Sequence, residues 1–294
     1  MNGWCSSHWP DAVGHLYGLC ARARRLAAFA LCVWVALFAV PLKALTTNFE
    51  APGAPEDIAD TLRSASSLMS NEALASATPQ EILATALADY RALIQVLYDR
   101  GFFGPDISIR LNGREASNIP LIQPPGQIDR VEIRVQTGPL FRFGTARVEP
   151  LAPETELPEG FATGAPATTG AIRSAALAGR DRWRELGYAK VDLGTQRIVA
   201  NHRAQRVDAD LKLIPGQKLR FGKLIVVGNV DVRENAIQRI AAIPTGEVFE
   251  PSKANRVATR LRRTGSFQSV SLAEAETANP DGTLDFTATV SEQL

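Results

Sequence analysis

The chain is poor in cysteine, and this absence limits its chemistry. Among 294 residues only three are cysteines, Cys5, Cys20 and Cys32, and all three lie near the N-terminus. From residue 33 onward the chain therefore has no disulfide, no thiolate metal ligand and no thiol nucleophile. Its stability must come from packed hydrophobic cores alone.

Other groups that usually carry out catalysis are also scarce. His202 is the only histidine beyond residue 44, and it lies in a polar connection between two expected strands, with no partner at metal-ligand spacing. We interpret it as a solvated loop residue. Asp208 and Asp210 alternate along a strand, which places them on one face, and we interpret that face as solvated rather than as an acid/base pair. No phosphate-binding glycine loop, calcium loop or Ser/His/Asp combination is visible, so the sequence predicts no enzyme, no cofactor and no metal site.

The net charge of the chain is small, and its longest apolar run is short. The formal net charge is +1, and beyond residue 44 we count 28 basic against 30 acidic residues. This balance gives no reason to expect nucleic acid as a partner. The one long apolar run, Leu26–Val40, has 15 residues and is shorter than the ~20 needed to cross a bilayer. It follows Arg22, Arg24 and Arg25, so we predict a signal peptide over 1–44, cleaved near Ala44. A retained membrane anchor is the alternative.

Against these absences stands an internal repeat. The stretch "GPLFRFGTARVEP" (138–150) returns as "PGQKLRFGKLIVV" (215–227). Gly144, which ends the first "RFG", lies 43 residues before Gly187, and Gly222, which ends the second, lies 43 residues before Gly265. Gly101 stands in the same kind of glycine-aromatic motif further upstream. A repeated spacing indicates repeated folds. We predict three modules after the signal peptide, over 45–138, 139–216 and 217–294.

Each module is expected to follow the order strand, helix, helix, strand, strand. In the first, Thr78, Pro79 and Glu81 form a helix-start signature. In the second, the segment for the first helix is rich in Pro, Gly and Thr, which predicts a short or irregular helix. In the third, Asp231 is expected to cap a helix. The predicted fold class is therefore α+β, with each module a small three-stranded mixed sheet covered by two helices.

Two further groups have simple interpretations. Phe141, Phe143 and Phe221 start strands and are expected in cores or between modules. The cationic stretch "RLRRTG" (260–265) ends an expected helix, where cations interact favourably with the helix dipole. Contact with lipid headgroups or barrel turns is the functional alternative for these cations.

The repeat resembles polypeptide-transport-associated (POTRA) domains. The resemblance rests on the glycine-aromatic motif after the second helix, the tandem copies and the export signal, and covers about residues 45–294. It is strongest in "LRFGKLIVVGN" and "PTGEVFEPSKANRVATRLRRTGSFQSVSL". Three modules rather than five are similar to the TamA side of the TamA/BamA-like outer-membrane assembly factors. Those proteins continue into a β-barrel, whereas this sequence stops at "TVSEQL". The expectation is therefore the periplasmic arm alone, either as a fragment or with a barrel supplied separately.

The resemblance implies a non-enzymatic function at the periplasmic face of the outer membrane. Such an arm would bind unfolded outer-membrane protein clients by adding them as strands to free sheet edges, and a TamB-like inner-membrane protein is a further expected partner. The candidate edges are 105–111, 189–199 and 267–273. A module of a two-partner secretion transporter, an inner-membrane-anchored division-type POTRA protein and a periplasmic hydrolase with an unrecognised site stay open. The edge strand most expected to bind clients comprises Phe267, Gln268, Ser269, Val270, Ser271 and Leu272.

Overall fold

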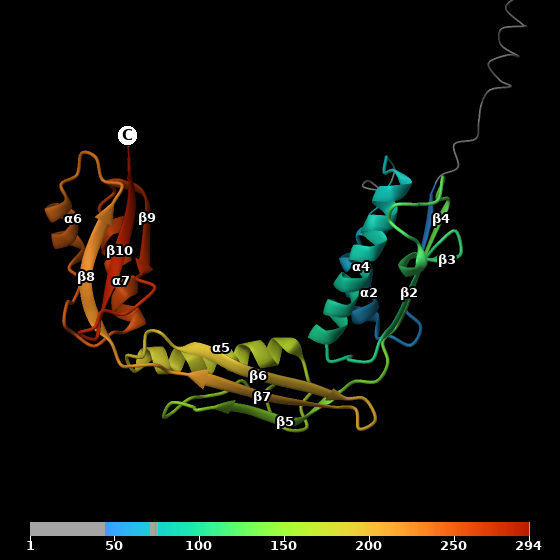
Figure 1. The fold of residues 1–294 in the computed structure, drawn as a ribbon, viewed down its shortest axis with the longest axis horizontal. Coiled ribbons are helices and arrows are strands. Elements are labelled where there is room, and N and C mark those ends of the chain that lie inside the picture. Colours follow the sequence, from blue (N-terminus) through green and yellow to red (C-terminus); the bar gives the residue numbers. More distant parts are fainter. Residues whose placement is uncertain (1–44, 71–73, 75, 294) are drawn as a thin grey trace, which may run out of the picture. The chain divides into compact units, whose positions relative to one another are not determined.

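The computed structural model describes residues 45–293 except 71–73 and 75 (Figure 1). The expected signal peptide, 1–44, lies outside these residues. Within the described part of the chain, no helix combines the length and apolar character that crossing a bilayer requires. The elements in chain order are β1 (Thr46–Glu50), α2 (Glu56–Ala65), η1 (Ser67–Met69), α4 (Pro79–Asp99), β2 (Asp106–Leu111), β3 (Arg114–Glu115), η2 (Ala116–Asn118), β4 (Arg130–Gln136), β5 (Arg142–Glu149), α5 (Thr169–Glu185), β6 (Asp192–Asn201), β7 (Arg206–Ile214), β8 (Arg220–Val227), α6 (Glu234–Ala241), α7 (Pro251–Arg262), β9 (Phe267–Glu274) and β10 (Thr283–Glu292).

Three small sheets carry the fold, and they confirm the predicted α+β class. Their strand orders are β1-β4-β2-β3, β5-β7-β6 and β8-β10-β9. In the second and third sheets the central strand runs parallel to the first strand and antiparallel to its other neighbour. A parallel pair needs a crossover connection, and the helical segments of each module supply it. The first sheet has a fourth, two-residue strand, β3, that the sequence did not indicate.

In the first module the helix-start signature forms as expected. Thr78 Oγ1 accepts from the Glu81 N–H at 3.3 Å, and Glu81 Oε2 accepts from the Thr78 N–H at 2.7 Å, with Pro79 at the first position of α4. Asp89 on α4 is buried, yet it is fully paired. Its carboxylate accepts from the Ser66 hydroxyl and from two backbone N–H groups at the start of η1. The buried carboxylate thus holds η1 against α4.

The second module has one helix where two were expected. Between β5 and α5 the chain forms no helix, because its Pro- and Gly-rich sequence cannot sustain one. Instead this segment follows β5: the Phe143 N–H donates to the Ala165 carbonyl at 2.9 Å, and the Gly164 N–H donates to the Phe143 carbonyl at 2.8 Å. Phe161 from this loop is buried edge-on against Phe143, with ring centroids 5.2 Å apart. A loop aromatic therefore replaces part of the missing helix.

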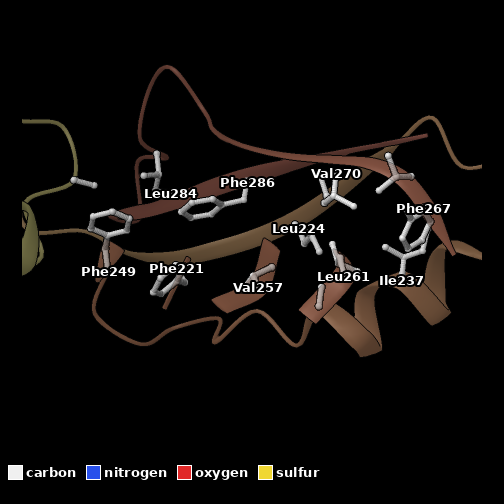
Figure 2. Close-up of a cluster of buried hydrophobic side chains, with 14 of the residues drawn as sticks. Phe221, Leu224, Ile237, Phe249, Val257, Leu261, Phe267, Val270, Leu284 and Phe286 are labelled. Carbon is white, nitrogen blue, oxygen red and sulfur yellow. The ribbon is translucent and has the colours of Figure 1, made fainter. Parts of the chain in front are cut away.

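The third module packs two helices on one face of its sheet. Figure 2 shows Phe221, Phe249 and Phe286 grouped at one end of this core, with centroids 5.3 to 6.3 Å apart. Ile237 from α6 and Leu261 from α7 are fully buried in the same cluster. Burial also confirms the core placement expected for Phe141, Phe143 and Phe221.

The repeated "RFG" has one structure in both copies. Arg142 Nη1 donates to the Gly164 carbonyl at 2.9 Å, and Arg220 Nη1 donates to the Gly246 carbonyl at 2.8 Å. The phenylalanine of each motif enters the core, and the strand register shifts at each glycine. The repeat therefore encodes an arginine that anchors the later loop leading into the last helix of its module, a core aromatic and a β-bulge.

A glycine with a left-handed backbone conformation follows the last helix of each module. Gly101, Gly187 and Gly265 have φ values of +90°, +104° and +70°, a conformation that favours glycine after a helix. The Phe141 N–H donates to the Gly101 carbonyl and the Leu219 N–H to the Gly187 carbonyl, both at 2.9 Å. Gly101 and Gly187 thus end a helix and also accept a hydrogen bond from the residue just before the first strand of the following module.

The expected cap at Asp231 is wrong. Helix α6 begins at Glu234 after Arg233, and no side chain caps it. Glu292, at the end of β10, instead accepts from the N–H groups of Val230, Asp231 and Val232 at 2.7, 2.9 and 3.0 Å. A carboxylate distant in sequence therefore organises the loop, which the local pattern could not reveal.

Candidate functional site

The structure places the six candidate edge residues on β9, at one edge of the third sheet. Phe267 and Val270 point into the core, each 8% exposed, while Ser269 and Ser271 are exposed. The strand pairs antiparallel with β10. Its other side has no neighbouring strand in the described part of the chain, which leaves backbone groups for pairing.

One carbonyl of β9 is already occupied. Arg262, at the end of α7, donates from Nη2 to the Val270 carbonyl at 3.1 Å. An extended ligand would have to share or displace this charge-assisted bond. The β9 edge is therefore partly closed by a side chain of its own module.

The expected edge at 105–111 is wrong at its end, where β2 lies between β4 and β3. β3 pairs with its end, at Arg110 and Leu111. The Glu115 carboxylate on β3 accepts from the Ile109 N–H at 3.0 Å and from the Ser108 hydroxyl at 2.7 Å, and also from the Tyr90 hydroxyl. Side-chain bonding thus extends the closed part of this edge to Ile109.

The same cluster shifts two pKa values. Burial, followed by the hydrogen bond to Glu115, raises the pKa of Tyr90. Burial alone would raise the pKa of Glu115, but the bonds from Tyr90, Ser108 and the Ile109 N–H together lower it. Both shifts keep the phenol protonated and the carboxylate charged, which maintains the closed edge.

The third candidate edge, β6, is open on both of its faces. Ile198 and Val199 are 46% and 45% exposed, although neighbouring residues of a strand point to opposite faces. Ile198 pairs with buried Ala209, and Val199 pairs with exposed Asp208, so Ile198 lies on the helix side of the sheet. No side chain in the described residues hydrogen-bonds to the backbone of 195–200. Among the three candidates, β6 is the strand with large exposed apolar side chains.

The position of α5 over the sheet explains this exposure. In the third module two helices share the sheet, with α6 over β8 and α7 over β9. In the second, α5 packs against all three strands and most closely against the central one. The loop that replaces the first helix lies along β5. This strand forms the other edge of the sheet, away from β6. As a result the helix-facing side of β6 stays partly uncovered.

The other polar candidates do not form a catalytic site. His202 lies in the β6–β7 loop, exposed, with its ring edge-on against Phe141 at 5.4 Å. Asp208 and Asp210 share the outer face of β7, where Asp210 lies 3.8 Å from the Arg147 guanidinium. Over the described residues, no group of three or more His, Cys, Asp or Glu side chains could hold a metal ion.

Two arginines of "RLRRTG", Arg260 and Arg262, donate hydrogen bonds to carbonyls, but these carbonyls belong to other elements than their own helix. Arg260 donates to the carbonyls of Ala241 and Ala242 at the end of α6, with Nε–O of 2.9 Å to Ala241. Arg262 donates to β9, as described above. The sequence predicted capping of their own helix, whereas these side chains satisfy carbonyls of neighbouring segments.

The comparisons with known proteins agree with this architecture. Residues 219–293 match the POTRA family, described as "Surface antigen variable number repeat". Over 115 residues the chain is 30% identical to the outer membrane protein assembly factor BamA of Nitratidesulfovibrio vulgaris. The match covers 38% of this chain but only 14% of that relative, so the chain spans a small part of the relative's length.

A solved structure of POTRA domains shows the same fold. The crystal structure of Haemophilus influenzae BamA POTRA3-5 superposes with a TM-score of 0.55 at 14% identity, covering 85% of this chain and 96% of that one. BamA from Haemophilus ducreyi lacking POTRA domains 1-3 is a more partial match, with a TM-score of 0.42 at 16% identity, over 52% of this chain and 30% of that one. The predicted resemblance to POTRA domains of BamA-like assembly factors is thus confirmed for the family. The narrower likeness to TamA stays a prediction.

Proposed function

We propose that this chain, a set of POTRA-like modules related to those of BamA-like factors, is a periplasmic arm in outer-membrane β-barrel and autotransporter assembly. In this function it binds unfolded client strands by pairing them with a free sheet edge. The observation that carries the proposal is the β6 edge, which over 195–200 has no side-chain hydrogen bond to its backbone in the described residues and exposes an apolar side chain on each face. The BamA relationship supports the assembly role, and the edge geometry supports the mode of binding.

An extended strand fits β6 better than a helix does. A strand added at an edge places side chains above and below the sheet, so it can contact Ile198 on one face and Val199 on the other. A docked helix would cover one face only. The backbone would supply most of the affinity, which suits a protein that handles clients of many sequences.

This function requires no catalysis. Strand pairing uses backbone N–H and C=O groups, and the polar side chains discussed above are occupied in structural hydrogen bonds or solvated. We therefore propose a scaffold rather than an enzyme. A TamB-like partner at the inner membrane stays a prediction, because no described surface is specific to it.

The absence of cysteine beyond residue 32 provides a direct test. We would introduce a single cysteine at β6 (Arg197→Cys), at β9 (Ser271→Cys) or on the outer face of α5 (Leu177→Cys), all exposed positions, in the form beginning at Leu45. Each variant is offered a peptide with the alternating pattern of a barrel strand and one cysteine. We expect disulfide capture to be strongest at β6, weaker at β9 and lowest on α5.

Proline substitutions distinguish binding through the backbone from binding through side chains. Of Ile198→Pro and Val199→Pro, the one whose N–H points away from β7 should keep the fold but lose capture, because proline cannot donate to a ladder. Val199→Thr, which keeps the backbone donor, should retain capture. Equal capture on α5, or undiminished capture by the folded proline variant, would rule out edge pairing.

A further inference from the structure

Helix α7 has an unusual charge composition. Between Pro251 and its C-cap Arg263 it carries five cations and no acidic residue. Helix α5 of the preceding module carries four arginines, and three of them are paired with carboxylates. Arg180, Arg182 and Arg184 form ion pairs at 2.5 to 2.9 Å. The charge of α7 is thus left largely uncompensated, in contrast to that of α5.

The individual contacts of α7 show which of its cations form no ion pair. Lys253 pairs with Glu247 at 2.7 Å and Glu250 at 3.7 Å. Arg260 donates only to the neutral carbonyls of Ala241 and Ala242, so its charge is not neutralised. In the residues that the structure describes, Arg256 and Arg263 are exposed and take part in no ion pair.

These free cations lie on one side of the helix. Positions 256, 260 and 263 follow spacings of four and three residues, which places them along one stripe. The buried residues of α7, Val257, Ala258 and Leu261, form a separate face.

Helix α6 extends this stripe. The bonds from Arg260 hold the end of α6 beside it, which brings in Arg239 and Ile240, the latter 37% exposed. Arg239 also takes part in no ion pair in the described part of the chain. We call Arg239, Ile240, Arg256, Arg260 and Arg263 the basic face.

We propose that the basic face binds an anionic lipid surface. Four guanidinium groups that form no ion pair in the described residues attract a negatively charged partner, and guanidinium binds phosphate groups well. The exposed Ile240 among these cations matches helices that lie at membrane interfaces, with apolar and basic side chains together. The near-neutral charge of the chain beyond residue 44 argues against nucleic acid. The face is distinct from the β6 edge, so this proposal does not depend on client binding.

The test is binding to vesicles by sedimentation. The protein is the form beginning at Leu45, which contains the whole compact unit Thr47–Leu294. We expect it to sediment with vesicles of phosphatidylglycerol and phosphatidylcholine but not with phosphatidylcholine alone, and added salt should weaken binding. Arg256→Gln with Arg263→Gln should lower the partition coefficient roughly 30-fold, since each basic residue near an anionic surface contributes about fivefold.

A matched control removes the same charge elsewhere. Arg91→Gln with Arg173→Gln replaces two exposed arginines, on α4 and α5, that have no ion pair in the described residues. This variant should bind vesicles as the parent does. An equal loss in both variants would mean a general charge effect and would overturn the proposal.

Three further outcomes would also overturn it. Equal binding to phosphatidylcholine vesicles would show that the interaction is not electrostatic. Release by millimolar inorganic phosphate at constant ionic strength would indicate a discrete phosphate site. Binding to poly-glutamate that is as tight as binding to vesicles, and equally sensitive to the double variant, would assign the face to an acidic protein segment. Circular dichroism should show the same melting curve for all variants, because the replaced side chains are exposed.

Discussion

Gly222 on β8 lies directly against Asp285 on the neighbouring strand β10. The Lys223 N–H donates to Asp285 Oδ1 at 2.7 Å, and a Cβ at Gly222 would overlap this carboxylate and lie 2.9 Å from the backbone carbonyl of Leu284. Gly144 and Asp208 form the same pair in the second module, where the missing Cβ would lie 2.5 Å from Asp208 Oδ1. Both pairs occupy a β-bulge.

The two pairs predict different losses of folding stability for the same glycine-to-alanine substitution. Gly222→Ala should destabilise the third module by about 2 kcal/mol or more, because backbone atoms block the Cβ. Gly144→Ala should cost less, since only the end of the Asp208 side chain has to move. Chemical denaturation measures both, by circular dichroism for the third module and by fluorescence of Trp183, the one tryptophan beyond residue 44, for the second. Asp208→Ala should restore most of the stability lost in Gly144→Ala. Equal costs would contradict the structural difference.

These pairs illustrate what the sequence was able to predict. The repeated "RFG" and the 43-residue glycine spacing are local patterns, and they indicated the modules, the strand order and the core aromatics. The bulge itself depends on an aspartate about 60 residues away, which no local pattern specifies. In the same way, the two-residue β3 and its Glu115 bonds close one end of the β2 edge. Whether an edge is open is decided by such long-range side-chain bonds, so sequence alone gave three candidates.

The helix-ending glycines should also differ in their sensitivity. Gly265 has φ of +70° with open space around its Cβ position, so Gly265→Ala should cost about 1 kcal/mol for the backbone conformation alone. At Gly187, with φ of +104°, a Cβ would lie 2.6 Å from Val248 Cγ1, so Gly187→Ala should cost clearly more. Thermal melts of the two variants provide the comparison. A larger loss in Gly265→Ala would mean that crowding at Gly187 is relieved by movement of Val248.

Stability should depend on the ionisation of Glu292. Hydrogen bonds from the N–H groups of Val230, Val232 and Asp231 hold the pKa of Glu292 below its ordinary value of 4.5. A carboxylate with a depressed folded-state pKa contributes stability that is fully present above its unfolded pKa. That stability is lost as the pH falls through the lower, folded pKa. We therefore expect the third module to lose stability below about pH 4.5.

Two variants isolate this effect. Glu292→Gln should lower stability at neutral pH and reduce its pH dependence below pH 4.5, because it cannot ionise. Glu276→Gln removes an exposed carboxylate of the same module and should leave the pH dependence of unfolding close to that of the parent. An unchanged acid transition in Glu292→Gln would show that other carboxylates dominate it.

Processing of the N-terminus can be predicted from the basic and apolar leader. We expect protein isolated from the periplasm to begin within a few residues of Leu45, as measured by intact mass and N-terminal peptide mapping. Such a product would contain no cysteine, so it should not react with a thiol reagent after denaturation. Recovery of intact protein from the inner membrane would instead support the anchored alternative.

The last prediction concerns Arg262, which occupies the Val270 carbonyl on β9. Removing its guanidinium in Arg262→Gln should open this edge, because a glutamine side chain is too short to make the same bond from the end of α7. Disulfide capture of a barrel-strand peptide at Ser271→Cys should then rise toward the level expected at β6. Arg263→Gln is the matched control, since it removes the neighbouring charge without touching β9, and should leave capture at Ser271→Cys unchanged. An equal rise in both variants would attribute the effect to charge. No rise in Arg262→Gln would mean that the accessibility of β9 is set by its burial against α7, and that the Arg262 bond does not close the edge.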